Sequence, residues 1–320
     1  MTMKQQATRR IADAERILII GHVSPDGDAI GSLLGLGLAL YPRKASVVLA
    51  CADPVPEQYR HLPHWDRIVQ APQGEFDLVV SLDCSDLQRL GSAYDVAAYA
   101  DLPLLNIDHH TTNVFFGTVN WVEPTAAATA QMLVSLLRAL DIPFTVEIAT
   151  CLLHGIITDT LGFRTPNTTP EIMEVAVELT RAGAPFVELT ERAFSHRPLG
   201  TIRMWAMALQ RMQLEGRILW SEITQEMRQS AGYIEEGDAG LVNFLGAADE
   251  ADIAVVFSEL DGGQVDVSMR ASPKYDVSEV ALTLGGGGHP QAAGCTLTGP
   301  LTAVRGRVLS LLEQAWRAQT

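Results

Sequence analysis

Side chains that bind metal ions follow an apolar run near the start of the chain. The run covers residues 16–20, and the polar segment 21–32 that follows it contains His22, Asp26 and Asp28. An imidazole and two carboxylates so close together are typical ligands of divalent metal ions. Asp28 could instead cap the following helix, but a cap accounts for one acid and leaves the other two side chains unexplained. The segment therefore predicts a metal site.

Two later apolar runs end in the same kind of side chain. Residues 76–82 are predicted to form a buried strand that ends at Asp83, and residues 102–107 a strand that continues into the Asp-His-His triplet at 108–110. Three predicted strands thus lead into acids or histidines. Ligand-type residues at three strand ends are a stronger signal than any one of them alone.

Helix-like segments between and after these strands indicate the fold class. Residues 29–41, 87–100 and 125–140 have helical patterns, which predict crossovers between parallel strands of a doubly wound α/β sheet. In such sheets ligands bind beyond the carboxyl ends of the strands, so the three groups of side chains are expected to converge. Asp159, in a polar turn after a further helix-like stretch, is expected to join them.

A chain of 320 residues is long enough for two domains. Its character changes near residue 216, after which shorter strands and a hairpin around residues 261–263 are predicted. We expect an α/β domain that binds metal over residues 1–190, a helical linker over 191–215 and a smaller α/β substrate-binding domain over 216–320.

Four consecutive glycines, at 285–288, precede His289 in the second domain. Ordering glycine costs conformational entropy, but glycine lets backbone N–H groups come close to an anion. The run is therefore interpreted as an anion-binding loop rather than as packing or a flexible hairpin loop. A dinucleotide-binding fingerprint fits poorly, because no acidic residue follows about twenty positions later.

Composition limits the possible partners. A formal net charge of −15 argues against a long electropositive groove for duplex or extended single-stranded nucleic acid, so any nucleic acid partner should be short. The polar N-terminus lacks a signal-peptide pattern, and the apolar runs are too short to cross a bilayer. We expect a cytoplasmic protein without membrane contact. The four scattered cysteines predict neither a disulfide framework nor a zinc knuckle.

Together these motifs resemble the DHH phosphoesterase family, which is named for the triplet found here at 108–110, and the resemblance covers essentially the whole chain. It implies two divalent ions bridged by Asp83 in a phosphoryl-transfer centre. Oxygen and imidazole ligands without thiolate favour Mn²⁺, with Mg²⁺ or Co²⁺ as alternatives. By the resemblance, one ion would be held by His22, Asp26 and Asp83, and the other by Asp28, Asp83, His109 and Asp159.

The resemblance also implies roles for the remaining residues. Asp108 would orient a neighbouring histidine. His110 would stabilise developing charge or protonate the leaving group, and a structural packing role is its alternative. Ala271 stands where the family often has serine, so Ser272 is assigned in its place. The second domain would bind substrate through Arg270, Ser272, Gly286, Gly287, Gly288 and His289.

The two-domain organisation is most similar to the branch of the family that degrades very short RNA to 5′-mononucleotides and dephosphorylates adenosine 3′,5′-bisphosphate. That activity implies in-line attack of a hydroxide shared by both metal ions. The expected partners are short oligoribonucleotides and nucleotide phosphates, and a homodimer is left open. One alternative is a phosphodiesterase for cyclic di-AMP or its linear product pApA. Another is a non-catalytic nucleotide sensor, although a pure sensor has no need for two metals.

Overall fold

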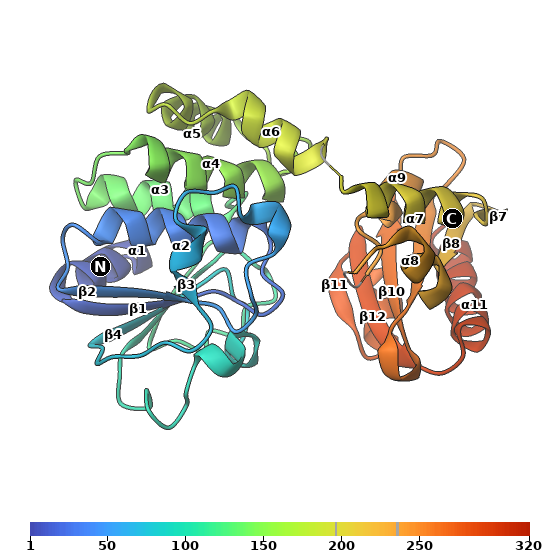
Figure 1. The fold of residues 1–320 in the computed structure, drawn as a ribbon, viewed down its shortest axis with the longest axis horizontal. Coiled ribbons are helices and arrows are strands. Elements are labelled where there is room, and N and C mark those ends of the chain that lie inside the picture. Colours follow the sequence, from blue (N-terminus) through green and yellow to red (C-terminus); the bar gives the residue numbers. More distant parts are fainter. Residues whose placement is uncertain (196, 235–236) are drawn as a thin grey trace. The chain divides into compact units, whose positions relative to one another are not determined.

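The computed structural model describes residues 1–195, 197–234 and 237–320. The chain divides into two compact units, Met1–His196 and Arg197–Thr320 (Figure 1). The three-part division expected from the sequence, with a separate helical linker, stays a prediction. Within the described residues, no helix has both the length and the apolar composition needed to cross a membrane.

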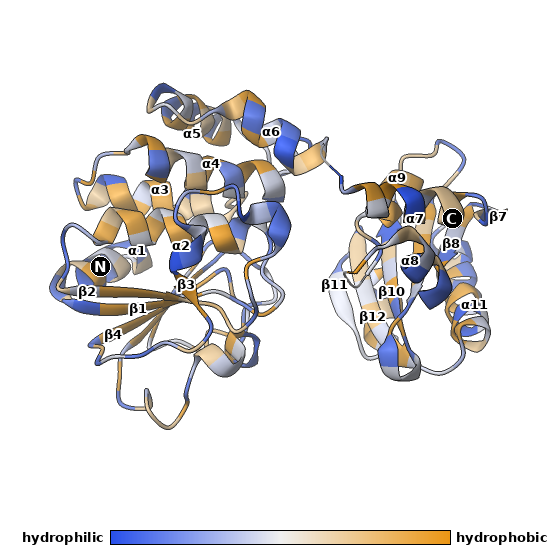
Figure 2. Ribbon diagram, in the orientation of Figure 1, coloured by the Kyte–Doolittle hydropathy of each residue, from blue (hydrophilic) through white to orange (hydrophobic). Residues whose placement is uncertain are grey.

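The first unit is built on a six-stranded sheet with the order β3-β2-β1-β4-β5-β6, in which all neighbouring strands are parallel. The central strands are buried on both faces, which is why they appear in the sequence as continuous apolar runs, and Figure 2 colours them as hydrophobic. The predicted parallel α/β fold is confirmed. The strands are β1 (Arg16–Ile20), β2 (Ser46–Ala50), β3 (Ile68–Val69), β4 (Leu78–Leu82), β5 (Leu104–Asp108) and β6 (Val119–Val122).

α-Helices cover one face of this sheet, and α5 and α6 pack outside α4 (Figure 1). Most of the apolar core of the unit lies between the sheet and the inner helices. The helices are α1 (Met3–Asp13), α2 (Gly27–Leu40), α3 (Thr129–Ala139), α4 (Val146–Asp159), α5 (Pro170–Arg181) and α6 (Phe186–Phe194). Short 3₁₀ segments are η1 (Glu57–Tyr59), η2 (Trp65–Arg67) and η3 (Leu87–Ala93).

The other face of the sheet is covered differently from the sequence prediction. The helix expected over residues 87–100 is wrong: the segment forms the short η3, and Gly91 within it has a left-handed φ of 56° that no α-helix contains. Leu90 and Ala93 of η3 nevertheless pack against this face, beside Phe76. A 3₁₀ segment therefore takes the place of a crossover helix.

Helices α2 and α4 approach each other closely through glycine. A Cβ atom on Gly31 would lie 2.5 Å from the carbonyl oxygen of Cys151 in α4. A Cβ atom on Gly155 would lie 2.6 Å from Oδ1 of Asp28. Because these contacts leave no room for a side chain, the two glycines bring the N-terminus of α2 next to the C-terminal half of α4.

The second unit has a mixed six-stranded sheet with the order β11-β12-β10-β9-β8-β7. Among its described residues only β8 and β9 pair in parallel, and the predicted hairpin joins β9 to β10 through the 3₁₀ segment η4 (Asp261–Gly263). Helices α10 and α11 pack on one face, and α7, α8 and α9 on the other. The strands are β7 (Gln213–Glu215), β8 (Ile218–Ile223), β9 (Ile253–Glu259), β10 (Gln264–Ala271), β11 (Gly287–His289) and β12 (Ala292–Thr298). The helices are α7 (Leu199–Leu209), α8 (Gln225–Ala231), α9 (Leu241–Leu245), α10 (Ser278–Thr283) and α11 (Leu301–Gln319).

Candidate metal centre

The loop between β1 and α2 carries the first two ligand-type side chains. Asp26 is the N-cap of α2, where its Oδ1 accepts hydrogen bonds from the backbone N–H groups of Asp28 and Ala29 at 3.1 and 3.0 Å. His22 turns its Nε2 toward Asp26 Oδ1, at 3.8 Å. The capping role considered for Asp28 in its own helix thus falls to Asp26, because α2 begins at Gly27.

Asp28 is buried and caps a different helix. Its Oδ2 accepts a hydrogen bond from the backbone N–H of Thr129 at 2.6 Å, and its Oδ1 accepts one from that of Ala130 at 3.0 Å. Both donors belong to the first turn of α3, whose N-cap residue, Ala128, has no polar side chain to satisfy them. Ser32 also donates to Asp28 Oδ1 at 3.2 Å. The acid therefore joins the starts of α2 and α3.

Asp83 follows β4 with a left-handed φ of 57°, a conformation uncommon outside glycine and often found at functional sites. Its Oδ2 lies 3.6 Å from His22 Nε2, and its Oδ1 lies 3.5 Å from His109 Nε2. Oδ1 also accepts a hydrogen bond from the hydroxyl of Thr129 at 3.0 Å. The two oxygens of this one carboxylate thus face two different histidines.

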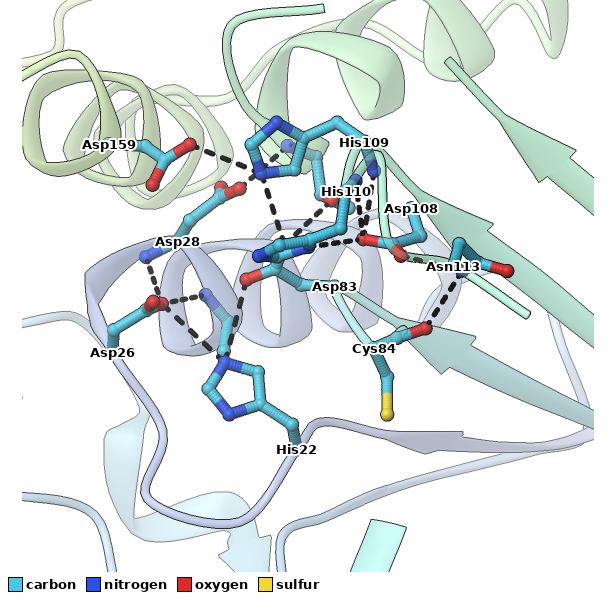
Figure 3. Close-up of polar contacts among 12 residues, drawn as sticks. His22, Asp26, Asp28, Asp83, Cys84, Asp108, His109, His110, Asn113 and Asp159 are labelled. Carbon is cyan, nitrogen blue, oxygen red and sulfur yellow. Dashed lines mark hydrogen bonds and ion pairs between the residues drawn. The ribbon is translucent and has the colours of Figure 1, made fainter. Parts of the chain in front are cut away.

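Asp108, the last residue of β5, has both oxygens engaged by neighbours (Figure 3). Its Oδ1 lies 2.7 Å from His110 Nδ1 and accepts from the backbone N–H groups of His109 and His110 at 2.8 and 3.2 Å. Its Oδ2 accepts from Asn113 Nδ2 at 2.6 Å. Asp108 is therefore placed to hold the ring of His110.

The side chains from these elements meet at one edge of the sheet (Figure 3). His109 Nε2 lies 3.2 Å from Oδ2 of Asp159, which ends α4. Potential ligand atoms form three groups, and within each group the atoms lie within 4.8 Å of one another. The groups are His22 with Asp26 and Asp83, Asp28 with His109 and Asp159, and Asp83 with His109 and His110.

The acids of this centre repel one another. Burial and the charge of Asp83 raise the pKa of Asp28 to about 7. Burial and the charge of Asp28 raise the pKa of Asp159 as well. Burial opposes protonation of His22, but contacts with Asp26 and Asp83 outweigh it and raise the pKa of His22 to about 10. The arrangement thus favours bound positive charge, as a metal-binding site does.

The donor set fits divalent cations. It offers carboxylate oxygens and imidazole nitrogens, which Mn²⁺, Mg²⁺ and Co²⁺ accept, and it contains no thiolate. Cys84 follows Asp83 directly but donates its thiol to the backbone oxygen of Asp86 at 3.0 Å. Burial also raises the pKa of the Cys84 thiol to about 12, so the thiolate that binds metals is disfavoured there.

Two side chains at the centre were missed by the sequence analysis. Thr129 donates to Asp83 from the start of α3, and Arg89 in η3 places Nη2 3.1 Å from His22 Nδ1. Neither belongs to a strand-end motif. The helix expected over residues 125–140 begins only at Thr129, and this start, which brings the Thr129 hydroxyl to Asp83, had no signal in the sequence.

The candidate substrate-binding residues lie at one end of the second sheet. Arg270, near the end of β10, donates from Nε to Asn243 Oδ1 at 2.7 Å and from Nη1 to the Met269 carbonyl oxygen at 2.9 Å. Ser272 follows β10 and donates its backbone N–H to the carbonyl oxygen of Asp252 at 2.8 Å. Gly287, Gly288 and His289 form the edge strand β11.

Packing does require glycine in this run, which corrects the sequence interpretation. A Cβ atom on Gly286 would collide with the carbonyl oxygen of Gly294 and with Cys295. One on Gly288, whose φ is 142°, would lie 2.5 Å from the carbonyl oxygen of Ala292. Gly287 has open space within 4 Å among the described residues. Close contact with β12 therefore explains two of the four glycines.

Comparison with known proteins agrees with this arrangement. The model of the DHH family N-terminal domain matches residues 16–156, and that of the DHHA1 domain matches residues 229–317. The chain is 39% identical over 290 residues to the bifunctional oligoribonuclease and PAP phosphatase NrnA of Thermus thermophilus, covering 88% of this chain and 84% of that protein. The Bacillus subtilis protein of the same name is 26% identical over 302 residues, or 92% and 93% of the two chains.

A solved structure is similar over nearly its whole length. The crystal structure of an exopolyphosphatase-related protein from Bacteroides fragilis superimposes with a TM-score of 0.87 and 25% identity, covering 99% of this chain and 96% of that one. The sequence matches, the shared fold and the clustered acids and histidines agree with one another: the chain belongs to the DHH family.

Proposed function

We propose that this protein is a metal-dependent phosphoesterase that degrades very short RNA to 5′-mononucleotides and dephosphorylates adenosine 3′,5′-bisphosphate. The names of the relatives from Thermus thermophilus and Bacillus subtilis support both activities. The observation that carries the proposal is Asp83, whose two oxygens face His22 and His109 at 3.6 and 3.5 Å. A carboxylate so placed suits a bridge between two cations in phosphoryl transfer.

Two divalent ions, with Mn²⁺ as the best match, belong to this proposal. When bound, they would supply a nucleophile at neutral pH and offset negative charge on the phosphoryl oxygens. Asp83 would contribute to both binding sites. The remaining ligands would be His22 and Asp26 on one side, and Asp28, His109 and Asp159 on the other.

Residues of the chain itself would orient the reacting groups. Asp108 Oδ1 lies 2.7 Å from His110 Nδ1, a contact that holds the imidazole ring beside Asp83. We assign His110 to stabilise the charge on the leaving oxygen or to give it a proton. Asp108 is then a positioning residue, because it acts through the ring that it holds.

The second unit would bind the rest of the substrate. Arg270 offers a guanidinium for a phosphate, and Asn243 fixes its Nε. As the edge strand of its sheet, β11 has one side of its backbone unpaired within the sheet, and it carries Gly287, Gly288 and His289. Together with Gly286 and Ser272, these residues form the proposed nucleotide site. The homodimer and the cytoplasmic location stay predictions.

The test supplies Mn²⁺ to metal-free protein and compares five substrates: a very short RNA, a long RNA, adenosine 3′,5′-bisphosphate, cyclic di-AMP and pyrophosphate. We expect mononucleotides from the short RNA and phosphate from the bisphosphate. Asp83→Asn should abolish both activities. Asp13→Asn, which removes an exposed acid of α1, should keep both.

The other outcomes are equally informative. Turnover of cyclic di-AMP alone would contradict the proposed substrates and favour the phosphodiesterase alternative. Tight nucleotide binding without any turnover would contradict an enzyme and favour a sensor. Activity that survives in Asp83→Asn would show that the acid bridging the two groups is not needed, which would remove the structural basis of the proposal.

A further inference from the structure

Arg89 carries a positive charge at the edge of the acidic centre without pairing with any of its acids. Its Nη2 lies 3.1 Å from His22 Nδ1. Across residues 1–195, 197–234 and 237–320, no carboxylate oxygen lies within 4.0 Å of its guanidinium nitrogens. Two other partly buried arginines do pair with acids, Arg217 with Asp252 at 3.0 Å and Arg305 with Glu222 at 2.7 Å, whereas Arg270 is bound by Asn243 instead.

The backbone around Arg89 is held firmly against the loop that contains His22. The Arg89 N–H donates to Asp86 Oδ1 at 3.2 Å, and its carbonyl oxygen accepts from the N–H of Val23 at 2.7 Å. Two residues later, a Cβ atom on Gly91 would lie 2.6 Å from Val23 Cγ1 and 2.8 Å from Ala52 Cβ. Only glycine permits this approach, so the fold itself places Arg89 beside the centre.

The protons of His22 leave the Nη2 donor of Arg89 without an acceptor on that ring. Nε2 of His22 faces Asp26 and Asp83, and it needs its lone pair to bind a metal ion. The ring proton then sits on Nδ1, which lies 2.7 Å from the carbonyl oxygen of Val23 and donates to it. A protonated Nδ1 cannot accept from Arg89. In the metal-binding form of His22, the Nη2 donor of Arg89 therefore lacks an acceptor on this ring.

We propose that Arg89 binds the non-bridging oxygens of the substrate phosphate held at the metal centre, an inference that rests on the proposed function. A guanidinium offers donors in a planar fork that matches two phosphate oxygens. Its charge is permanent, so it also acts as charge builds on the phosphoryl group in the transition state. This role makes Arg89 a catalytic residue supplied by the first unit, separate from Arg270 of the second.

The experiment compares Arg89→Met with Arg9→Met, which removes an exposed arginine paired with Asp13 on α1. Calorimetry first measures Mn²⁺ binding, and then the binding of inorganic phosphate at saturating Mn²⁺. For Arg89→Met we expect unchanged Mn²⁺ affinity, phosphate affinity lower by about 10-fold or more, and kcat/KM for the bisphosphate lower by about 10- to 100-fold. Arg89→Lys, which keeps the charge but loses the fork, should fall between wild type and Arg89→Met. Arg9→Met should match the wild type.

Phosphate affinity equal to that of the wild type in Arg89→Met would overturn the inference. So would weakened Mn²⁺ binding with normal phosphate affinity at saturating Mn²⁺, because Arg89 would then act only on the position of His22. If Arg89→Met does not fold, Arg89→Gln decides by the same two measurements. Failure of the wild type to hydrolyse the short RNA and the bisphosphate would refute the proposed function instead, and phosphate binding would still test Arg89.

Discussion

A buried histidine in α4 predicts how the stability of the first unit depends on pH. His154 is 1% exposed, and neither of its ring nitrogens has a hydrogen-bond partner among the described residues. The rings of Tyr59 and His61 pack edge-on against it, with centroid distances of 5.6 and 5.0 Å. Burial, together with the nearby His61, lowers the pKa of His154 to about 3. The folded protein therefore holds this imidazole neutral.

The size of the effect follows from the pKa in the two states. In the unfolded chain the pKa of a histidine is about 6.5. Above that pH neither state binds the proton, so His154 adds no pH dependence. Below that pH the unfolded state binds a proton on His154 that the folded state does not bind. The free energy of unfolding therefore falls by about 1.4 kcal/mol per pH unit until about pH 3. At about pH 5 the loss amounts to about 2 kcal/mol.

The assay is urea unfolding of wild type and His154→Leu at about pH 7.5 and about pH 5. Between these conditions the variant should lose about 2 kcal/mol less stability than the wild type, because other titrating groups are common to both. At the higher pH it should be at least as stable, since two unpaired nitrogens are replaced by carbon. His154→Gln should share the reduced acid sensitivity but be less stable than His154→Leu, because its amide stays unpaired. The same acid sensitivity in wild type and both variants would refute the reasoning.

Three further substitutions test the supports of the metal centre and the surface of α11. Thr129→Val removes the hydroxyl that donates to Asp83, so Mn²⁺ affinity measured by calorimetry should fall about 10-fold, whereas Thr129→Ser should keep it. Gly155→Ala would place a Cβ atom 2.6 Å from Asp28 Oδ1, so both the thermal midpoint and Mn²⁺ affinity should drop; unchanged values would contradict the close packing of α2 and α4. Gly306→Ala, where a Cβ atom meets no described atom within 4 Å, should raise the free energy of urea unfolding by about 0.5 to 1 kcal/mol.

The strand-end residues were predictable because their positions follow from one rule of sheet geometry. Asp83 and the triplet at 108–110 come directly after apolar runs, and the carboxyl ends of parallel strands meet at one edge. The partners of Asp28 were not predictable in this way. Its hydrogen bonds to Thr129 and Ala130 join residues about a hundred positions apart, and they depend on where α3 begins relative to α2.

The errors have a similar cause. A helical pattern over residues 87–100 was expected to form a crossover helix, but the backbone turns at Gly91 so that η3 can pack against Val23 and Ala52. The glycine run was interpreted as serving anion contact rather than packing, but Gly286 also packs closely against β12. In both cases the glycine allows close contact with a segment that is distant in the sequence. A local sequence pattern does not tell which segment that is.

The starts of two helices stabilise two of the acids that face one another in this centre. Asp26 accepts two backbone N–H groups at the start of α2, and Asp28 accepts two at the start of α3. A helix N-terminus carries partial positive charge, so each of these contacts favours the ionised carboxylate. The pKa of Asp28 is raised all the same, so this stabilisation is incomplete, and Asp159, whose pKa is also raised, lies at the C-terminal end of α4 and receives none of it. The fold thus supplies part of the positive charge that these carboxylates require, and bound divalent ions would supply the remainder.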